Sequence, residues 1–171
     1  METIGITRYD SPAGEMLVGA YRDSICICDW AHSRRRATID RRIARYTGAG
    51  YADGRTDVTD RAISELEEYF AGKRMEFTIP MLFTGTEFQH RVWTELMRIP
   101  YGITISYGEL ARRIGNPNAV RAVASANATN PLSILVPCHR VIGHDNRLTG
   151  YGGGLEIKQM LLTLEAERMG G

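Results

Sequence analysis

Cys138 and His139 are the residues whose types and positions are best suited to chemistry, and they lie side by side after a short apolar run. A thiol is a nucleophile when it is ionised, and a free cysteine with a pKa of about 8.5 needs a neighbouring base or cation for that at neutral pH. His139 is such a neighbour. Pro137 has a fixed φ and no N–H, so we expect a strand over residues 134–136 to stop at Cys138 and leave the thiol facing a cleft. The alternative is a buried structural cysteine beside a surface histidine, because neighbours in sequence need not meet in space.

The composition indicates a globular protein with its own core. Of the 171 residues 43% are hydrophobic, and the formal net charge is +1, so the charge alone does not indicate a nucleic-acid partner. The apolar runs are too short to span a bilayer, and the start of the chain lacks the pattern of a secretory signal. We therefore expect a cytoplasmic protein without a membrane partner. Its three cysteines, an odd number, should then be reduced rather than form a disulfide framework.

Residues 1–85 are predicted to form an α/β domain, with Gly85 as its boundary. Two β-rich runs separated by turn residues begin this half, and apolar residues at helical spacing follow them. The expected elements are strands over residues 15–20, 24–30 and 77–82, helices over residues 34–46 and 59–71, and a loop over residues 47–57.

Residues 86–171 are predicted to be mainly helical. Thr86 is placed to cap the first helix, and Ser106 with Glu109 has the spacing of a capping box before the second. The expected helices cover residues 86–98, 106–114, 118–128 and 157–164. The second and third are short and are joined by a turn that contains glycine and proline, which is typical of a helix-turn-helix.

The third of these helices is made almost entirely of small side chains. Arg121 is its one charged residue, so the helix can approach another surface very closely. Packing against a neighbouring helix is one use of such a surface. The other is entry into a DNA minor groove about 6 Å wide, with Arg121 intruding into the base stack or holding the space of a displaced nucleotide.

Several separated segments together resemble one family, the O6-alkylguanine-DNA alkyltransferases, also called methylated-DNA–protein-cysteine methyltransferases. Beside Pro-Cys-His-Arg-Val at residues 137–141 they run in family order over about half of the chain, at residues 85–89, 92–93, 99–102, 106–111, 119–123, 130–131, 149–153 and 158–165. The resemblance implies a ribonuclease-H-like N-terminal domain, a small antiparallel sheet with helices, over residues 1–85. It implies a mainly α, winged-helix-like C-terminal domain with a helix-turn-helix and the active site over residues 86–171.

The resemblance also implies direct-reversal DNA repair by a single-turnover methyltransferase. The alkyl group would move from O6 of a guanine flipped out of duplex DNA, or from O4 of an alkylated thymine, irreversibly to the Cys138 sulfur. By the same resemblance His139 acts through a water as the base for Cys138, and Glu165 orients and stabilises the imidazolium. A plain surface role at the end of a helix is the alternative for Glu165. Asn130 would brace the turn that leads to the active-site strand.

Substrate and DNA contacts follow from the resemblance as well. Tyr107 would donate to N3 of the flipped guanine, and the backbone carbonyls around Cys138 and Val141 would accept from its amino group. Tyr151 would border the pocket, and the backbone N–H of Gly152 would reach the guanine oxygen. Lys158 matches a family lysine near the active site, with a surface role equally open. The DNA contacts fall on the helix of small side chains, at Ala119, Val120, Arg121 and Ser125.

No cofactor and no metal ion is expected. Cys26, Cys28 and His32 invite a zinc site, but both sulfurs would face one side of a strand without an evident fourth ligand. The expected partner is double-stranded DNA with O6-alkylguanine, bound by a protein that is monomeric in solution, with cooperative assembly on DNA left open. A module that binds alkylated DNA and recruits repair factors is a second hypothesis, against which Cys138 argues. A transcription regulator reading the major groove is a third, and helix 118–128 has few base-reading side chains for it.

Overall fold

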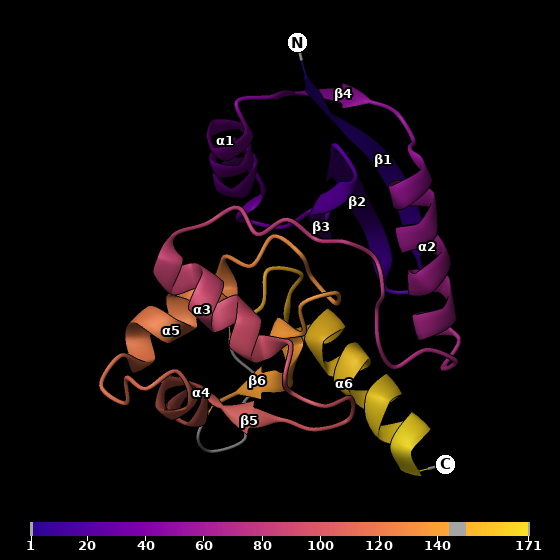
Figure 1. The fold of residues 1–171 in the computed structure, drawn as a ribbon. Coiled ribbons are helices and arrows are strands. Elements are labelled where there is room, and N and C mark those ends of the chain that lie inside the picture. Colours follow the sequence, from indigo (N-terminus) through magenta and orange to yellow (C-terminus); the bar gives the residue numbers. More distant parts are fainter. Residues whose placement is uncertain (1, 144–149, 171) are drawn as a thin grey trace. The chain divides into compact units, whose positions relative to one another are not determined.

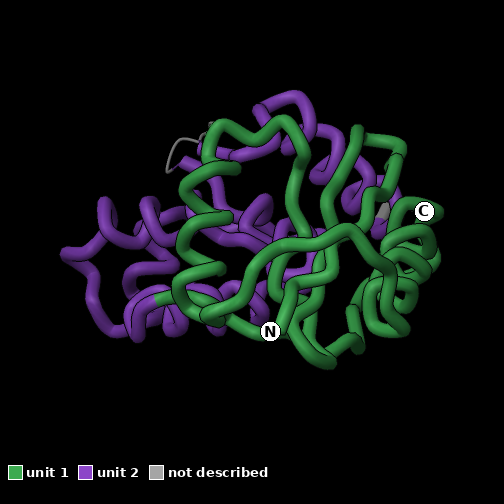
Figure 2. Tube along the Cα trace, turned by 90° about the horizontal axis from the view of Figure 1, so that it is seen from above, with its two compact units in different colours: residues 1–85 green, residues 86–171 purple. Residues whose placement is uncertain are grey.

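The chain folds into two compact units, residues 1–85 and 86–171 (Figures 1 and 2). The computed structural model describes residues 2–143 and 150–170. Each unit has its own sheet and its own buried apolar residues. Across these described ranges, no helix combines the length and the apolar character needed to cross a membrane.

Unit 1 is built on a four-stranded sheet with the strand order β3-β2-β1-β4. Its elements are β1 (Thr3–Ser11), β2 (Gly14–Tyr21), β3 (Ser24–Trp30), α1 (Arg36–Thr47), β4 (Gly50–Asp53) and α2 (Asp57–Phe70). The expected α/β character is confirmed. The antiparallel sheet is not, because β4 runs parallel to β1, while β2 is antiparallel to both of its neighbours.

The parallel strand is a consequence of the connection through α1. β3 forms one edge of the sheet, and the chain crosses by way of α1 to the other edge, where β4 pairs with β1 in the same direction. β4 lies inside the segment 47–57 that was expected to be a loop, since its exposed Gly and Asp residues have low β propensity. In Figures 1 and 2, α1 and α2 lie on opposite sides of the strands. Both faces of the sheet are therefore covered.

Cys26 lies in a bulge, which corrects the expectation that Cys26 and Cys28 face one side of β3. The register with β2 shifts between Gly19 and Ala20, so Cys26 is an extra residue and the alternation of faces is interrupted. Cys26 packs with Ile27 in the cluster against α1. Both thiols are fully buried, and burial raises the pKa of Cys26 to about 12 and that of Cys28 further still. Neither sulfur is therefore suited to be a nucleophile or a ready metal ligand.

The strand expected over residues 77–82 is wrong. Only Met81 forms a bridge, with Ile25 at the start of β3, and the preceding proline has no N–H to extend a ladder. Thr78 is drawn to α2 instead, where its backbone N–H donates to the buried Glu65 carboxylate at 2.8 Å. The segment is thus fixed by a side chain of α2 rather than by strand pairing.

Unit 2 is mainly helical, as expected. Its elements are α3 (Glu87–Leu96), β5 (Ile105–Ser106), α4 (Tyr107–Arg113), α5 (Val120–Ala128), the 3-10 turn η1 (Cys138–Arg140), β6 (Val141–Ile142) and α6 (Leu155–Gly170). The two short strands pair in parallel. Thr86 caps α3 in a complete capping box. Ser106 caps α4, but the Glu109 carboxylate pairs with arginines of the same helix, so only half of the expected box forms.

α4 and α5 are the two short helices joined by a turn that the sequence predicted. α4 ends before Gly115, which has a φ of +80°, and α5 begins at Val120, two residues later than expected. Trp93 of α3 fixes α5 from the inside, because its Nε1–H donates to the Ala126 carbonyl at 2.9 Å in the buried interior. The small side chains of α5 allow this close approach.

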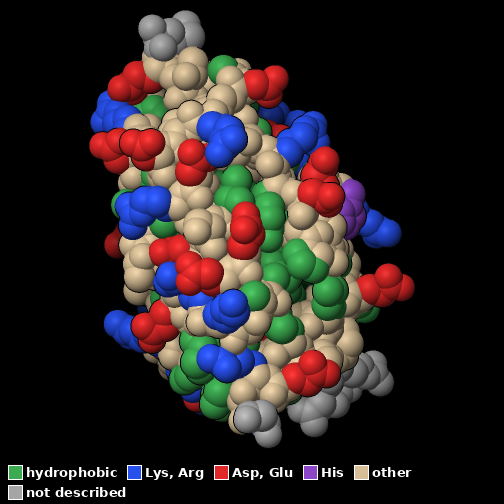
Figure 3. Space-filling view, turned by 90° about the vertical axis from the view of Figure 1, so that its right-hand side faces the viewer, with side chains coloured by type: hydrophobic (Ala, Val, Ile, Leu, Met, Phe, Trp, Pro, Cys, Tyr) green, Lys and Arg blue, Asp and Glu red, His purple; other side chains and the backbone are tan. Residues whose placement is uncertain are grey.

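The surface charge of the molecule is mixed. On the face shown in Figure 3, basic and acidic side chains are interspersed with each other and surround a band of hydrophobic side chains, in keeping with the formal net charge of +1. A charged partner would therefore meet local groups on this face rather than one extended field.

Candidate active site

The segment before Cys138 is a tight buried turn and not the expected strand. Ile134 has a φ of +71°, and Val136 N–H donates back to the Leu132 carbonyl at 2.8 Å. Asn130 fills the turn with its side chain: Oδ1 accepts from Leu132 N–H at 2.9 Å, and Nδ2 donates to the Val136 carbonyl at 2.9 Å. The first bond satisfies a buried backbone N–H that would otherwise lack a partner, and the second adds to the bond that the Val136 carbonyl accepts from Cys138 N–H. Asn130 therefore braces the turn that delivers Cys138.

Cys138 begins η1 with a side chain that is 4% exposed. Its backbone is fixed on both sides, since its N–H donates to the Val136 carbonyl at 2.7 Å and its carbonyl accepts from Val141 N–H. The same carbonyl accepts from Nδ2 of Asn127 at 3.3 Å. Asn127 lies on the buried side of α5, so the backbone of the thiol is tied directly to that helix.

His139 and Glu165 form a buried pair, as the resemblance implied. Nε2 of His139 lies 2.7 Å from Oε2 of Glu165, and neither side chain is more than 1% exposed, which contradicts the alternative of a surface role for Glu165. Nδ1 of His139 is buried and has no hydrogen bond to any described residue. With the proton on Nε2 facing the carboxylate, Nδ1 carries the lone pair of the ring.

Arg140 and Gly102 complete the surroundings of Glu165. Nε and Nη2 of Arg140 donate to Oε1 and Oε2 at 2.8 and 3.1 Å, and the backbone N–H of Gly102 donates to Oε1 at 3.1 Å. Together with His139, these groups give the carboxylate four hydrogen bonds, one for each lone-pair direction. Nη1 of Arg140 is anchored in turn by the Ile99 carbonyl at 2.8 Å.

The charges around this pair set the protonation states. Burial lowers the pKa of His139, and the positive charges of Arg140 and Lys158 add to that effect, while the hydrogen bond to Glu165 and the negative charge of Glu165 act against it. Burial alone would raise the pKa of Glu165, but the hydrogen bonds from His139 and Arg140 bring it well below its usual value. At neutral pH the site thus holds an ionised carboxylate beside a neutral imidazole.

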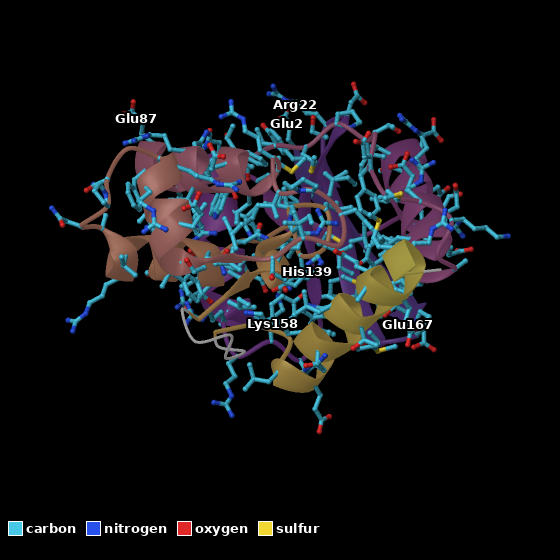
Figure 4. The ribbon with its side chains drawn as sticks, turned by 90° about the horizontal axis from the view of Figure 1, so that it is seen from below. Glu2, Arg22, Glu87, His139, Lys158 and Glu167 are labelled. Carbon is cyan, nitrogen blue, oxygen red and sulfur yellow. The ribbon has the colours of Figure 1, made fainter. Side chains whose placement is uncertain are left out.

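Lys158, Tyr107 and Val141 lie together near Cys138. Nζ of Lys158 donates to the Val141 carbonyl at 2.6 Å and lies 6.0 Å from the centre of the Tyr107 ring. Burial lowers the pKa of Lys158 to about 8, and the negative charge of an ionised Cys138 acts in the opposite direction. The surface role left open for Lys158 is contradicted, since the side chain is fully buried. Figure 4 shows Lys158 on α6 and His139 beside this helix.

Tyr151 and Gly152 belong to the half-buried turn that precedes α6. Gly150 at the start of this turn has a φ of +54°, and a Cβ added there would lie 3.4 Å from the Tyr107 hydroxyl oxygen. The turn and Tyr107 are therefore neighbours, as a shared pocket requires. Thr149, quoted from the sequence as part of this loop, lies outside the described residues.

α5 has one packed and one exposed side. Its buried residues are Val123, Ala126 and Asn127. Arg121 and Ser125 are exposed, Val120 is 39% exposed, and Ala119 is half-buried. Arg121 has no ion pair or hydrogen bond with the described part of the chain. The helix thus has a tightly packed face, as one of the two interpretations of its small side chains expected, and an exposed face that carries a single cation.

The sequence did not indicate three of the residues that build this site. Arg140 stood in the matched motif without a role, although a charge inside an apolar run is a signal of a buried ion pair. Asn127 looked like one more small polar residue of α5. Gly102 offered no signal, because its partner Glu165 is 63 residues away.

Comparisons with known proteins bear on this arrangement. Residues 87–167 match the family described as 6-O-methylguanine DNA methyltransferase, DNA binding domain. A methylated-DNA–protein-cysteine methyltransferase of Methanosarcina barkeri is 39% identical over 160 residues, which cover 94% of this chain and 96% of that protein. The chain belongs to the methylated-DNA–protein-cysteine methyltransferase family.

Two mycobacterial relatives extend the comparison. The methylated-DNA–protein-cysteine methyltransferase of Mycobacterium leprae is 56% identical over 108 residues, which are 63% of this chain and 66% of that protein, just under two thirds of its length. The crystal structure of Mycobacterium tuberculosis OGT in complex with DNA has a TM-score of 0.80 at 40% identity, covering 94% of this chain and 92% of that one. The family predicted from the motifs is confirmed, and the fold extends over both units.

Proposed function

We propose that this protein repairs alkylated DNA by direct reversal. The alkyl group on O6 of a guanine, or on O4 of a thymine, passes in one displacement to Sγ of Cys138. The S–C bond of a thioether forms as the C–O bond breaks, and the electron pair of that bond stays with the base. The thiol proton leaves through His139, and the departing base takes up a proton, so that the reaction is balanced without a cofactor. Because the thioether is stable, each protein molecule reacts once.

One observation carries this proposal: a buried Cys138 is followed by His139, whose Nε2 is held at 2.7 Å by Glu165 while Nδ1 is left as the basic atom. This is the order of nucleophile, base and orienting carboxylate that activates a weak nucleophile. We infer that a water links Nδ1 to the thiol, since a buried ring nitrogen needs a hydrogen-bonding partner.

Tyr107, Gly152 and nearby backbone carbonyls would hold the flipped guanine. The Tyr107 hydroxyl would donate to N3 of the guanine and help the guanine leave as a neutral species, and Gly152 N–H would reach the guanine oxygen. The carbonyls of Cys138 and Val141 would accept from the guanine amino group. Both carbonyls already accept other hydrogen bonds, so we favour Val141, which has one such bond described against two for Cys138.

Double-stranded DNA would bind at the exposed side of α5. The small side chains Ala119, Val120 and Ser125 would enter the minor groove, and Arg121, which has no ion pair within the described residues, would take the place of the extruded nucleotide. The family match to a DNA-binding domain over residues 87–167 supports this partner, as does the DNA complex of the M. tuberculosis relative. For this function we also expect unit 1 to be ribonuclease-H-like and unit 2 to be winged-helix-like. We expect the protein to be a cytoplasmic monomer.

A labelling experiment tests the function. A duplex with one O6-[³H]methylguanine is incubated in excess over the protein, and the label should move once per protein molecule to a single peptide that contains Cys138. Cys138→Ser should abolish the transfer, whereas Cys26→Ala should retain it as the matched control. Repeated turnover, or label retained in the Cys138→Ser protein, would refute the proposal. Tight binding of the duplex without transfer would favour a module that only recognises damage.

A further inference from the structure

Arg140 occupies a place that a structural ion pair alone does not explain. It is 6% exposed and binds both oxygens of Glu165, and one of these, Oε2, is the atom that holds His139. The guanidinium is itself fixed by the Ile99 carbonyl at 2.8 Å and by the face of the Tyr101 ring, whose centre lies 5.5 Å away. A bidentate pair of this kind fixes a carboxylate in direction as well as in position.

The protonation state of Glu165 determines which ring nitrogen of His139 carries the proton. Glu165 is buried at 1% exposure, where a lone carboxylate would tend to take up a proton. A protonated Glu165 could donate its O–H to Nε2, and the proton of the neutral imidazole would then lie on Nδ1, the atom needed as the base. A carboxylate without a counter-ion would have the opposite fault, since it would hold the imidazole in its charged form with both nitrogens blocked.

We propose that Arg140 is a positioning residue of the reaction: it holds the Glu165 carboxylate ionised and aimed at Nε2 of His139, so that the imidazole stays neutral with Nδ1 ready for the thiol proton. Before transfer the net charge of His139, Glu165 and Arg140 is zero. After the proton moves from Sγ to Nδ1, the imidazolium and the thiolate appear together, so the buried site gains no net charge. This inference deepens the proposed function and rests on it.

The other charged groups near His139 do not replace Arg140. Lys158 of α6 points to the Val141 carbonyl and adds a positive charge near Cys138. Tyr101, in the segment after α3, meets Arg140 through its ring, and Arg168 lies on the exposed last turns of α6. Within the described part of the chain, the cation that donates hydrogen bonds to both oxygens of Glu165 is Arg140.

Two substitutions separate the charge of Arg140 from its shape. The rate at which iodoacetamide alkylates Cys138 in the folded protein is measured by peptide mass spectrometry from pH 4 to 9. Arg140→Gln removes the charge, so the imidazole should stay protonated to higher pH, and the acid limb of the profile should move up by about one pH unit. Arg140→Lys keeps the charge but not the bidentate bond, so the limb should stay in place while the plateau falls several-fold. Arg168→Gln is the charge-matched control and should leave both unchanged.

A second measurement needs no substitution. In ¹⁵N spectra of the unaltered protein at pH 7, the His139 proton should be on Nε2. A proton on Nδ1, or an acid limb that does not move in a folded Arg140→Gln protein, would overturn the role of Arg140. If the limb moves as expected but no methyl group is taken from O6-methylguanine, the repair function fails and the positioning role of Arg140 stands. If transfer occurs but the limb is unmoved, the reverse holds.

Discussion

Replacing Asn130 by alanine should destabilise unit 2 by about 3 kcal/mol. The change leaves the buried N–H of Leu132, now 2.9 Å from the amide oxygen, without its partner. It also removes one of two hydrogen bonds to the Val136 carbonyl, which still accepts from Cys138 N–H. An unsatisfied buried group costs about 1–3 kcal/mol and a lost hydrogen bond about 0.5–1.5 kcal/mol, so the two losses together amount to about 3 kcal/mol.

Urea unfolding followed by Trp93 fluorescence measures this loss. The second tryptophan, Trp30, lies in unit 1, so both proteins are compared in a Trp30→Phe background. With a slope of about 2 kcal/mol per molar urea, the midpoint should fall by about 1.5 M. Asn118→Ala, at an exposed position before α5, is the matched control and should change stability by less than about 0.5 kcal/mol. A loss below about 1 kcal/mol for Asn130→Ala would refute the bracing of the turn.

Three further outcomes are expected. Arg121→Ala should slow methyl transfer from duplex DNA about tenfold or more while leaving the reaction with free O6-benzylguanine nearly unchanged, since the free base needs no extrusion; equal losses in the two rate measurements would contradict the assignment. Lys158→Met should stabilise unit 2 at pH 7, because a buried ammonium is removed. The pKa of Lys158 is about 8 in the folded protein against an ordinary value of 10.5, so the burial penalty is fully present below pH 8 and fades as the pH rises toward 10.5. The difference in urea midpoint between Lys158→Met and the unaltered protein should therefore be smaller at pH 10 than at pH 7. An equal difference at the two pH values would contradict this explanation. Gly102→Ala should destabilise by about 1 kcal/mol more than Gly115→Ala: both have a φ of +80°, which costs about 1 kcal/mol for a side chain, but only at Gly102 would the added Cβ meet another residue, 2.5 Å from Cγ of Met169. Equal thermal shifts for these two variants would show that the contact relaxes freely.

The features that could be predicted from the sequence are those set by a residue type at a fixed local spacing or by a motif. The caps at Thr86 and Ser106, the stop at Gly115 and the pairing of His139 with Glu165 were expected, because each depends on a residue type at a fixed spacing or on a motif. The α/β character of unit 1 and the helical character of unit 2 followed from periodicity.

The misses share a physical cause, which is that tertiary partners decided the local structure. Residues 134–136 have the composition of a strand, yet the amide of Asn130 supplies the hydrogen bonds that a neighbouring strand would have given. Residues 77–82 do not form a strand, because the backbone N–H of Thr78 donates to the Glu65 carboxylate instead of to a neighbouring strand. β4 was missed because pairing with β1 outweighs its poor propensity. The roles of Arg140 and Gly102 appear only once α6 brings Glu165 to them.

The hydrogen bond from Asn127 to the Cys138 carbonyl ties α5, the helix that we propose faces DNA, directly to the residue that we propose accepts the alkyl group. Trp93 also fixes α5 through its hydrogen bond to the Ala126 carbonyl. We therefore expect no hinge between α5, which would enter the groove, and Cys138, which would react. We therefore expect no closing motion of the protein between capture of a base and transfer of its alkyl group. The slow step of a successful encounter should belong to the DNA, in the time its damaged nucleotide takes to leave the stack, and not to a rearrangement around the thiol.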